Sequence, residues 1–98
     1  MTDIEQKVDM HEVNFEALKP WVSEQITKIL GIKDEVVIEL IFSFLENDRY
    51  PNGKTLQIVL IGFLQSEPAR KFVGQLWDHL LSAQENPSEL PDIQVLMT

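Results

Sequence analysis

Lys19-Pro20-Trp21-Val22 begins the helical run around which this 98-residue sequence is organised. Proline is tolerated in the first turn of an α-helix, where no backbone donor is missed, and disrupts a helix further in. Apolar side chains then recur on one face at spacings of four, three and one, at Val22, Ile26, Ile29 and Leu30. The pattern predicts a helix over residues 20–30 that Gly31 closes, with the Trp21 indole as its buried anchor.

The composition describes one small globular domain. A hydrophobic content of 44% with 24% charged residues is ordinary for a folded domain of 98 residues. The sequence contains no cysteine, which excludes disulfides and thiolate chemistry. No apolar run approaches the roughly 20 residues of a membrane-spanning helix, and the acidic start lacks the order of a signal peptide. We expect a soluble intracellular domain that neither enters a membrane nor binds a small-molecule substrate.

Two further helices follow in the middle of the sequence. Asp34 is a typical N-cap for a helix that is apolar in most directions, with a polar stripe at Glu39, Ser43 and Glu46. A helix with so narrow a polar stripe is expected at the centre of a fold. Residues 47–53 are rich in turn formers. Residues 54–65 are predicted to be helical, although their β-branched side chains would suit a strand, because no second strand is available to pair with them.

The last predicted helix begins after Ser66, which we interpret as its N-cap. Apolar side chains step by three and one from Ala69 to Leu81, the strongest amphipathic pattern in the sequence. Pro87 and Pro91 prevent the helix from continuing, so residues 87–98 are predicted to be a tail, docked through Ile93, Val95 and Leu96.

The N-terminal residues 1–13 show little periodicity and are expected to form a partly disordered arm with one turn. Asn14 then caps a short turn through Leu18, which must end near Lys19 because Pro20 cannot lie inside a helix. The sequence therefore predicts an all-α fold, a compact four-helix bundle. Its domain covers residues 14–86, between the arm and the tail.

The charge is unevenly distributed. The net charge of −8 argues by itself against a nucleic-acid partner. Residues 1–18 carry five acidic side chains and one lysine, and residues 85–98 carry three acidic side chains and no base. Residues 19–84 hold eight acids and seven bases, so the helical body is nearly neutral.

The seven bases of the body should gather at the two ends of an antiparallel bundle. One end would collect Lys28, Lys33, Arg70 and Lys71, and the other would collect Lys19, Arg49 and Lys54. Arg70 and Lys71 lie in the first turns of a helix, where cations oppose the helix dipole and gain nothing structurally. Both groups are candidates for phosphate contacts. The alternative is that seven scattered bases only keep the domain soluble.

Catalysis has little support. His11 lies in the acidic arm and His79 beside apolar residues of the last helix, and neither has a cysteine or a patterned serine partner. The sequence has no Glu-x-x-His pair for a metal site in a bundle and no Gly-rich phosphate loop. We therefore expect no enzyme, no metal and no cofactor.

Several stretches, in order, resemble the PWI domain. They are residues 7–10, 13–14, 19–22, 29–31, 34–42 (DEVVIELIF), 61–64, 69–70 and 76–86. The likeness is greatest to the version near the N-terminus of the serine/arginine repetitive matrix protein 1 family of splicing co-activators. It implies a four-helix bundle in a nuclear pre-mRNA processing factor that binds RNA and DNA with little sequence preference, helped by an adjacent basic segment. The signature residues of that family, here Pro20, Trp21 and Val22, are structural.

Two departures from the family pattern bear on binding. The stretch after the motif, basic in relatives, reads Ser23-Glu24-Gln25, and residues 1–6 and 87–98 contain no Lys or Arg. Nonspecific affinity is chiefly phosphate neutralisation. We therefore expect weak binding of RNA, with DNA as a second candidate, alongside other splicing factors. The rival hypothesis is a protein-interaction module of the splicing machinery that uses an apolar patch around Tyr50 or the tail.

Overall fold

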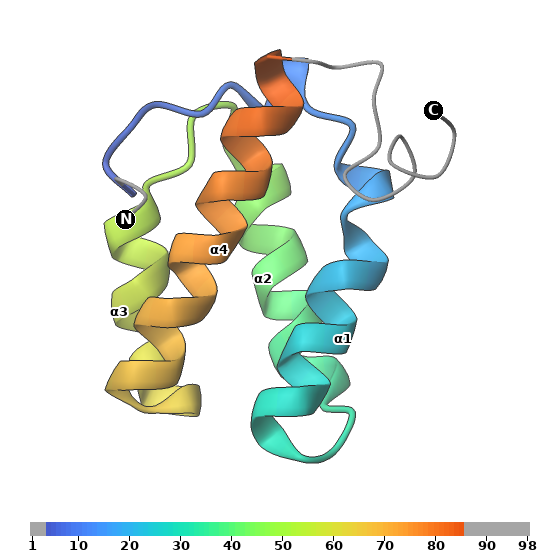
Figure 1. Ribbon diagram of the computed structural model, residues 1–98, viewed down its shortest axis with the longest axis vertical. Coiled ribbons are helices and arrows are strands. Elements are labelled where there is room, and N and C mark those ends of the chain that lie inside the picture. The colour runs from blue at the N-terminus through green and yellow to red at the C-terminus, as the bar shows by residue number, and fades with distance from the viewer. Residues whose placement is uncertain (1–3, 86–98) are drawn as a thin grey trace.

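The computed structural model describes residues 4–85, and within that range every regular element is helical (Figure 1). In chain order the elements are η1 Met10–Glu12, η2 Phe15–Ala17, α1 Lys19–Leu30, α2 Glu35–Asn47, α3 Gly53–Leu64 and α4 Ser66–Glu85. The predicted all-α four-helix fold is therefore confirmed. Among the described residues, no helix combines the length and the apolar content needed to cross a membrane. The predicted tail, with Ile93, Val95 and Leu96, lies outside the described residues.

Helix α1 begins and ends where local chemistry requires. Pro20 occupies its first turn, and the helix starts one residue earlier than predicted, at Lys19. Gly31 closes it in the left-handed conformation, with φ 83°, and donates its N–H to the Thr27 carbonyl. Only glycine adopts this backbone geometry without steric cost, which is why the helix stops there.

Helix α2 is capped as predicted but is not the central helix. The Asp34 side chain accepts hydrogen bonds from the N–H groups of Val36 and Val37, at 3.0 and 3.3 Å. Val36 is nevertheless 74% exposed, and α2 packs mainly on α1 and α3. The expectation from its nearly continuous apolar surface was wrong because some of that surface faces water. Helix α4 instead contacts α1, α3 and η1.

Helix α3 confirms the helical interpretation of a segment that could have been a strand. The Asn52 side chain caps it by accepting from the Thr55 N–H at 3.1 Å. Its buried stripe, Leu56, Leu60 and Leu64, repeats every fourth residue. This period fits an α-helix with one face toward the core. The opposite face carries further apolar side chains, which are exposed.

Helix α4 supplies the largest share of the core, including Phe72, Val73, Leu76, Trp77 and Leu80. It includes Ser66, which we had predicted as its cap, and its first turn closes by a bond from the Ala69 N–H to the Gln65 carbonyl. The Trp77 ring is fully buried, and its indole N–H donates to the Gln6 carbonyl at 3.1 Å. The largest buried anchor is thus Trp77 rather than Trp21.

Residues 4–13 are packed onto the helical body. Val8 is fully buried in the core. The Asp9 N–H donates to the Gln84 side chain at 2.7 Å, and the Met10 N–H donates to the Arg49 carbonyl at 2.8 Å. The single turn predicted for this segment is η1. Isolated apolar residues such as Val8 give no periodic signal, so its burial was not foreseen.

Both short connections, α1–α2 and α3–α4, lie at the same end of the bundle, the lower end in Figure 1. The start of α1, the loop that precedes α3 and the N-terminal segment lie at the other end. The end of α1 and the starts of α2 and α4 therefore share one end, as the sequence predicted. Gln65 makes the α3–α4 connection with a φ of 73°, an uncommon value for a residue other than glycine.

Candidate nucleic-acid interface

A groove of about 520 Å³ lies between α3 and α4 and brings together three of the predicted phosphate-binding cations. Its cationic residues are Lys54, Arg70 and Lys71. The remaining lining consists of Ile4, Gln57, Glu67, Gly74, Gln75 and Asp78. The sequence had assigned Lys54 to the opposite end from Arg70 and Lys71. The starts of α3 and α4 do lie at opposite ends, and the groove, which runs along the side of the bundle, is lined by all three cations.

Helical spacing explains this alignment. On α4 the lining residues Glu67, Lys71, Gly74 and Asp78 recur at intervals of four, three and four, so they form one stripe. On α3, Lys54 and Gln57 are three residues apart and share a face in the same way. The groove is open at Gly74, where an added Cβ would meet nothing within 4 Å.

The three groove cations differ in their acidic partners. Arg70 donates to Glu67 at 2.9 Å, and Lys54 pairs with Glu5 at 3.2 Å. All four of these side chains are exposed, so both pairs are weak and exchange readily with solvent ions. Within residues 4–85, Lys71 has no acidic partner within 4.0 Å. Lys71 is therefore the groove cation most available to an external anion.

Lys19, at the other end, is held by its surroundings. Its ammonium pairs with Glu16 at 2.9 Å and with Glu46 at 3.3 Å. Hydrogen bonds to these two carboxylates raise the pKa of Lys19 above its ordinary value. The same ammonium lies 5.2 Å from the centre of the Phe42 ring and 5.9 Å from that of Phe15. These contacts hold the Lys19 ammonium against η2 and α2.

Arg49 is also occupied. Its Nε and Nη2 donate to the two carboxylate oxygens of Asp9 at 2.9 and 3.0 Å, a bidentate arrangement. This hydrogen bonding lowers the pKa of Asp9 below its ordinary value and raises the pKa of Arg49. Asp9 of the packed N-terminal segment thus neutralises Arg49, one of the cations that the sequence predicted to contact phosphate.

Lys28 and Lys33 lie at the end of the bundle that the sequence predicted, but they do not line the groove. Lys33 pairs loosely with Glu35, at 3.8 Å. No acidic side chain in residues 4–85 lies within 4.0 Å of the Lys28 ammonium. Both lysines lie outside the groove.

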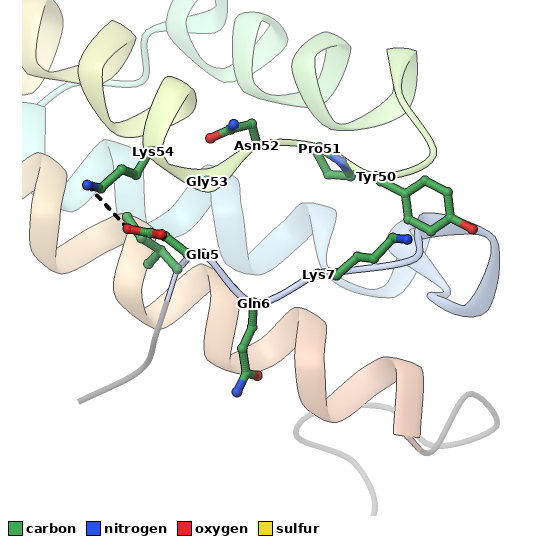
Figure 2. Close-up of a pocket in the computed structure, with 9 residues that line it drawn as sticks. Glu5, Gln6, Lys7, Tyr50, Pro51, Asn52, Gly53 and Lys54 are labelled. Carbon is green, nitrogen blue, oxygen red and sulfur yellow. Dashed lines mark ion pairs between the residues drawn. The ribbon is translucent and has the colours of Figure 1, made fainter.

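A second hollow, of about 300 Å³, lies where residues 4–7 cross the segment before α3 (Figure 2). Figure 2 shows the Lys54–Glu5 ion pair at one side and Lys7 beside Tyr50 at the other. The Lys7 ammonium is 4.2 Å from the centre of the Tyr50 ring, and the Arg49 guanidinium is 5.2 Å from it. The predicted apolar patch around Tyr50 is therefore partly shielded by two cations.

The three signature residues at the start of α1 have distinct environments. Pro20 is exposed in the first turn, and Val22 is fully buried. The Trp21 indole is half-buried and stacks on Phe72, with ring centroids 5.7 Å apart and an interplanar angle of 14°. Trp21 also makes an edge contact with the His79 ring, with ring centroids 4.5 Å apart. These contacts join α1 to α4.

The described residues contain no cluster of three or more His, Cys, Asp or Glu side chains arranged to hold a metal ion. No polar or charged side chain in residues 4–85 is buried.

Sequence reasoning missed Gln57, Gly74 and Gln75 as lining residues of the groove. The spacing of residues 67, 71, 74 and 78 was visible in the sequence, but the side of α4 that meets α3 was not. Lys7 was also missed, because its contact with Tyr50 joins segments that are far apart in the chain.

Comparison with known proteins agrees with this architecture. The sequence matches the PWI domain family over residues 16–88, a range that includes α1–α4 and Pro20-Trp21-Val22. It is 52% identical over 88 residues to serine/arginine repetitive matrix protein 1 of Gallus gallus, and the alignment covers 90% of this chain and 10% of that protein. The chain thus spans about a tenth of the length of this relative. The family match over residues 16–88 and the 52% identity to this relative show that the chain belongs to the PWI domain family.

Proposed function

We propose that this domain binds nucleic acid through phosphate contacts and without sequence preference, as a non-enzymatic module of a nuclear pre-mRNA splicing factor. RNA is the primary ligand and DNA a second one. The observation that carries the proposal is the convergence of Lys54, Arg70 and Lys71 on one groove. The likeness to a serine/arginine repetitive matrix protein supports the assignment to splicing.

The pattern of ion pairs predicts which cations contribute. Lys71 is free of acidic partners within residues 4–85, and Arg70 and Lys54 hold only exposed ones. Exposed pairs contribute little free energy, so a phosphate can replace the carboxylate. Lys28 and Lys33 provide a second, weaker region. Lys19 and Arg49 contribute least, because bonds to carboxylates already use their donors.

The same charges predict weak binding. Residues 4–85 contain thirteen acidic and eight basic side chains, so the domain as a whole repels a polyanion. Three phosphate contacts release few counterions. An added basic segment is expected to raise the affinity, because it supplies further contacts without changing the groove.

A salt titration tests the proposal. The full chain, alone and with a Lys/Arg-rich segment appended, is mixed with a short fluorescent single-stranded RNA at increasing salt. Three contacts predict a slope of about −2 for log affinity against log salt concentration, from about −0.7 per contact. Reversing Arg70 and Lys71 to Glu should leave a slope near −0.7, since about one contact remains.

Lys28→Glu is the matched control, because it makes the same change in charge outside the groove. A larger effect of Lys71→Glu than of Lys28→Glu supports the groove. Equal effects would assign binding to net charge alone. Undetectable binding at low salt with the basic segment present would reject the proposal and favour a protein partner.

A further inference from the structure

Helix α3 presents an uncharged apolar face to solvent. Ile58, which is 68% exposed, and Gly62 lie opposite the buried leucines, while Val59 (36% exposed) and Phe63 (49%) lie on one flank and Ile61 (36%) on the other. We call these residues the outer face of α3. No residue between Thr55 and Leu64 is charged. Single exposed apolar side chains are common on protein surfaces, but several adjacent ones without a charge are characteristic of a contact surface.

Gly62 is unexplained by the fold itself. It lies inside α3, where glycine is a poor helix former, and its φ is not positive. A Cβ at this position would meet nothing within 4 Å, so packing inside the domain does not require its absence. A missing side chain in the middle of an exposed face permits the close approach of a second backbone. Gly62 therefore points to a partner outside the domain.

The groove cations border the outer face on its α4 side. Ile61 follows Lys54 and Gln57 at helical spacing, so it lies on the groove side of α3. Of the three groove bases, Lys54 and Arg70 form exposed ion pairs, whereas Lys71 has no acidic partner within 4.0 Å in residues 4–85. A partner that covers the outer face would therefore meet the unpaired positive charge of Lys71 along this edge.

We propose that the outer face of α3 binds an amphipathic α-helix of a partner protein that carries acidic side chains beside its apolar stripe. The apolar stripe would cover Ile58 and Phe63 and pass over Gly62, and the acidic side chains would reach Lys71 and Arg70. Helical anchors at intervals of three and four suit such a surface. This site is additional to the proposed binding of nucleic acid, with which it shares only the groove cations.

The size of the face disfavours a second copy of this chain. Helix α3 has 12 residues and is therefore about 18 Å long. A surface of this length and one helix wide is smaller than the roughly 800 Å² per partner that stable dimers bury. RNA is also a poor occupant, because the outer face offers phosphates no charge.

Titration of the full chain with a synthetic amphipathic helix of about 15 residues, with Leu at its apolar positions and Glu beside them, tests the proposal. Amide chemical shifts should change on α3 and along the groove side of α4. A matched peptide with Lys in place of Glu should bind at least about tenfold more weakly. Absence of binding, or equal binding of the two peptides, would overturn the proposal.

Two variants identify the surface. Ile58→Ser should weaken peptide binding about tenfold or more without lowering the melting temperature, because this side chain is exposed. Gly62→Ala should raise the melting temperature and yet weaken binding, a combination that a purely structural role does not produce. Ile32→Ser is the control, since Ile32 is 67% exposed but lies in the connection between α1 and α2.

Two further measurements separate other occupants. Sedimentation equilibrium should show a monomer, and a dimer that Ile58→Ser abolishes would assign the face to self-association and reject the proposal. RNA binding should be unchanged by Ile58→Ser and reduced by Lys71→Glu. An RNA affinity that falls with Ile58→Ser would assign the face to nucleic acid instead. The peptide titration can therefore fail while RNA binding is retained, so the two proposals can be rejected separately.

Discussion

Arg49 and Lys71 carry the same charge on the same small domain, yet their surroundings differ. Arg49 meets a segment that is distant in sequence, and two of its guanidinium N–H groups donate to the carboxylate of Asp9. Lys71 lies on α4 beside an open groove, with no acidic partner within 4.0 Å in residues 4–85. The difference shows that the availability of a cation depends on the acids that the fold brings to it. The number of bases in the sequence is a poor guide to the binding surface.

The largest expected effect on stability comes from Trp77, the buried ring that contacts the N-terminal segment. Trp77→Ala should lower the free energy of unfolding by about 3–5 kcal/mol, because it removes a fully buried ring and the bond that holds the Gln6 carbonyl. Chemical denaturation measures the loss. Trp21→Ala is the control and should cost less, since that indole is half-buried. An equal or greater loss at Trp21 would contradict the assignment of Trp77 as the main anchor.

Gly53→Ala should have the next largest effect. A Cβ on Gly53 would lie 2.5 Å from the Ile4 carbonyl oxygen and 3.0 Å from the Trp77 ring, so the N-terminal segment must shift. We expect a loss of about 1–3 kcal/mol in the free energy of unfolding. Faster hydrogen exchange at the Asp9 and Met10 amides should accompany it. Unchanged exchange would show that the segment accommodates the methyl group.

Gly74→Ala, in the open groove, should act in the opposite direction. No atom lies within 4 Å of the added Cβ, and alanine favours a helix interior over glycine by about 1 kcal/mol. A thermal melt should therefore show a higher midpoint than the wild type. A lower midpoint would mean that the groove is narrower in solution than in the structure. Together with Gly53→Ala, this variant compares the crowded contact between Gly53 and the N-terminal segment with the open groove at Gly74.

Asp9→Asn should have the smallest effect on stability, and it turns an occupied cation into a free one. Loss of the carboxylate releases Arg49, so the salt slope of RNA binding should steepen by about 0.7, the value of one further contact. The same salt titration measures it. No change in slope would show that Arg49 remains inaccessible behind the N-terminal segment.

Acid titration provides a second measurement on this pair. The folded pKa of Asp9 lies below its ordinary value of 3.8, so the stabilisation from the Arg49 contact is present above that value. It is lost as the pH falls through the folded pKa. The free energy of unfolding of the wild type should therefore exceed that of Asp9→Asn above about pH 4, and the difference should disappear as the pH falls further. A constant difference between the two proteins across this range would contradict the assigned pair.

The helices were predictable because their signals are local. Pro20 and Gly31 begin and end α1 through their own backbone chemistry, and Asp34 caps α2 through residues two and three positions away. The amphipathic period of α4 was equally visible. Three expectations at this level were wrong: Ser66 lies inside α4, Asn14 makes no side-chain cap bond to η2, and α2 is not central because part of its apolar surface, including Val36, faces water.

The candidate site was less predictable. The cationic residues were identifiable, and their distribution between the two ends followed from antiparallel helices. Their partners were not, because the Asp9–Arg49 bond joins residues 40 positions apart and the Trp77–Gln6 bond joins residues 71 positions apart. Periodicity also cannot distinguish the buried from the exposed side of α3, since apolar side chains occur on both.

By itself, the sequence determined the four helices and the membership of the PWI domain family, since caps, periodicity and ordered motifs act over a few residues. Tertiary structure alone decided that Trp77 is the innermost indole and that acids of the N-terminal segment pair with Arg49 and Lys54. It also decided which apolar side chains of α3 face solvent. The physical reason is that burial and ion pairing depend on the approach of distant segments, which no local pattern encodes.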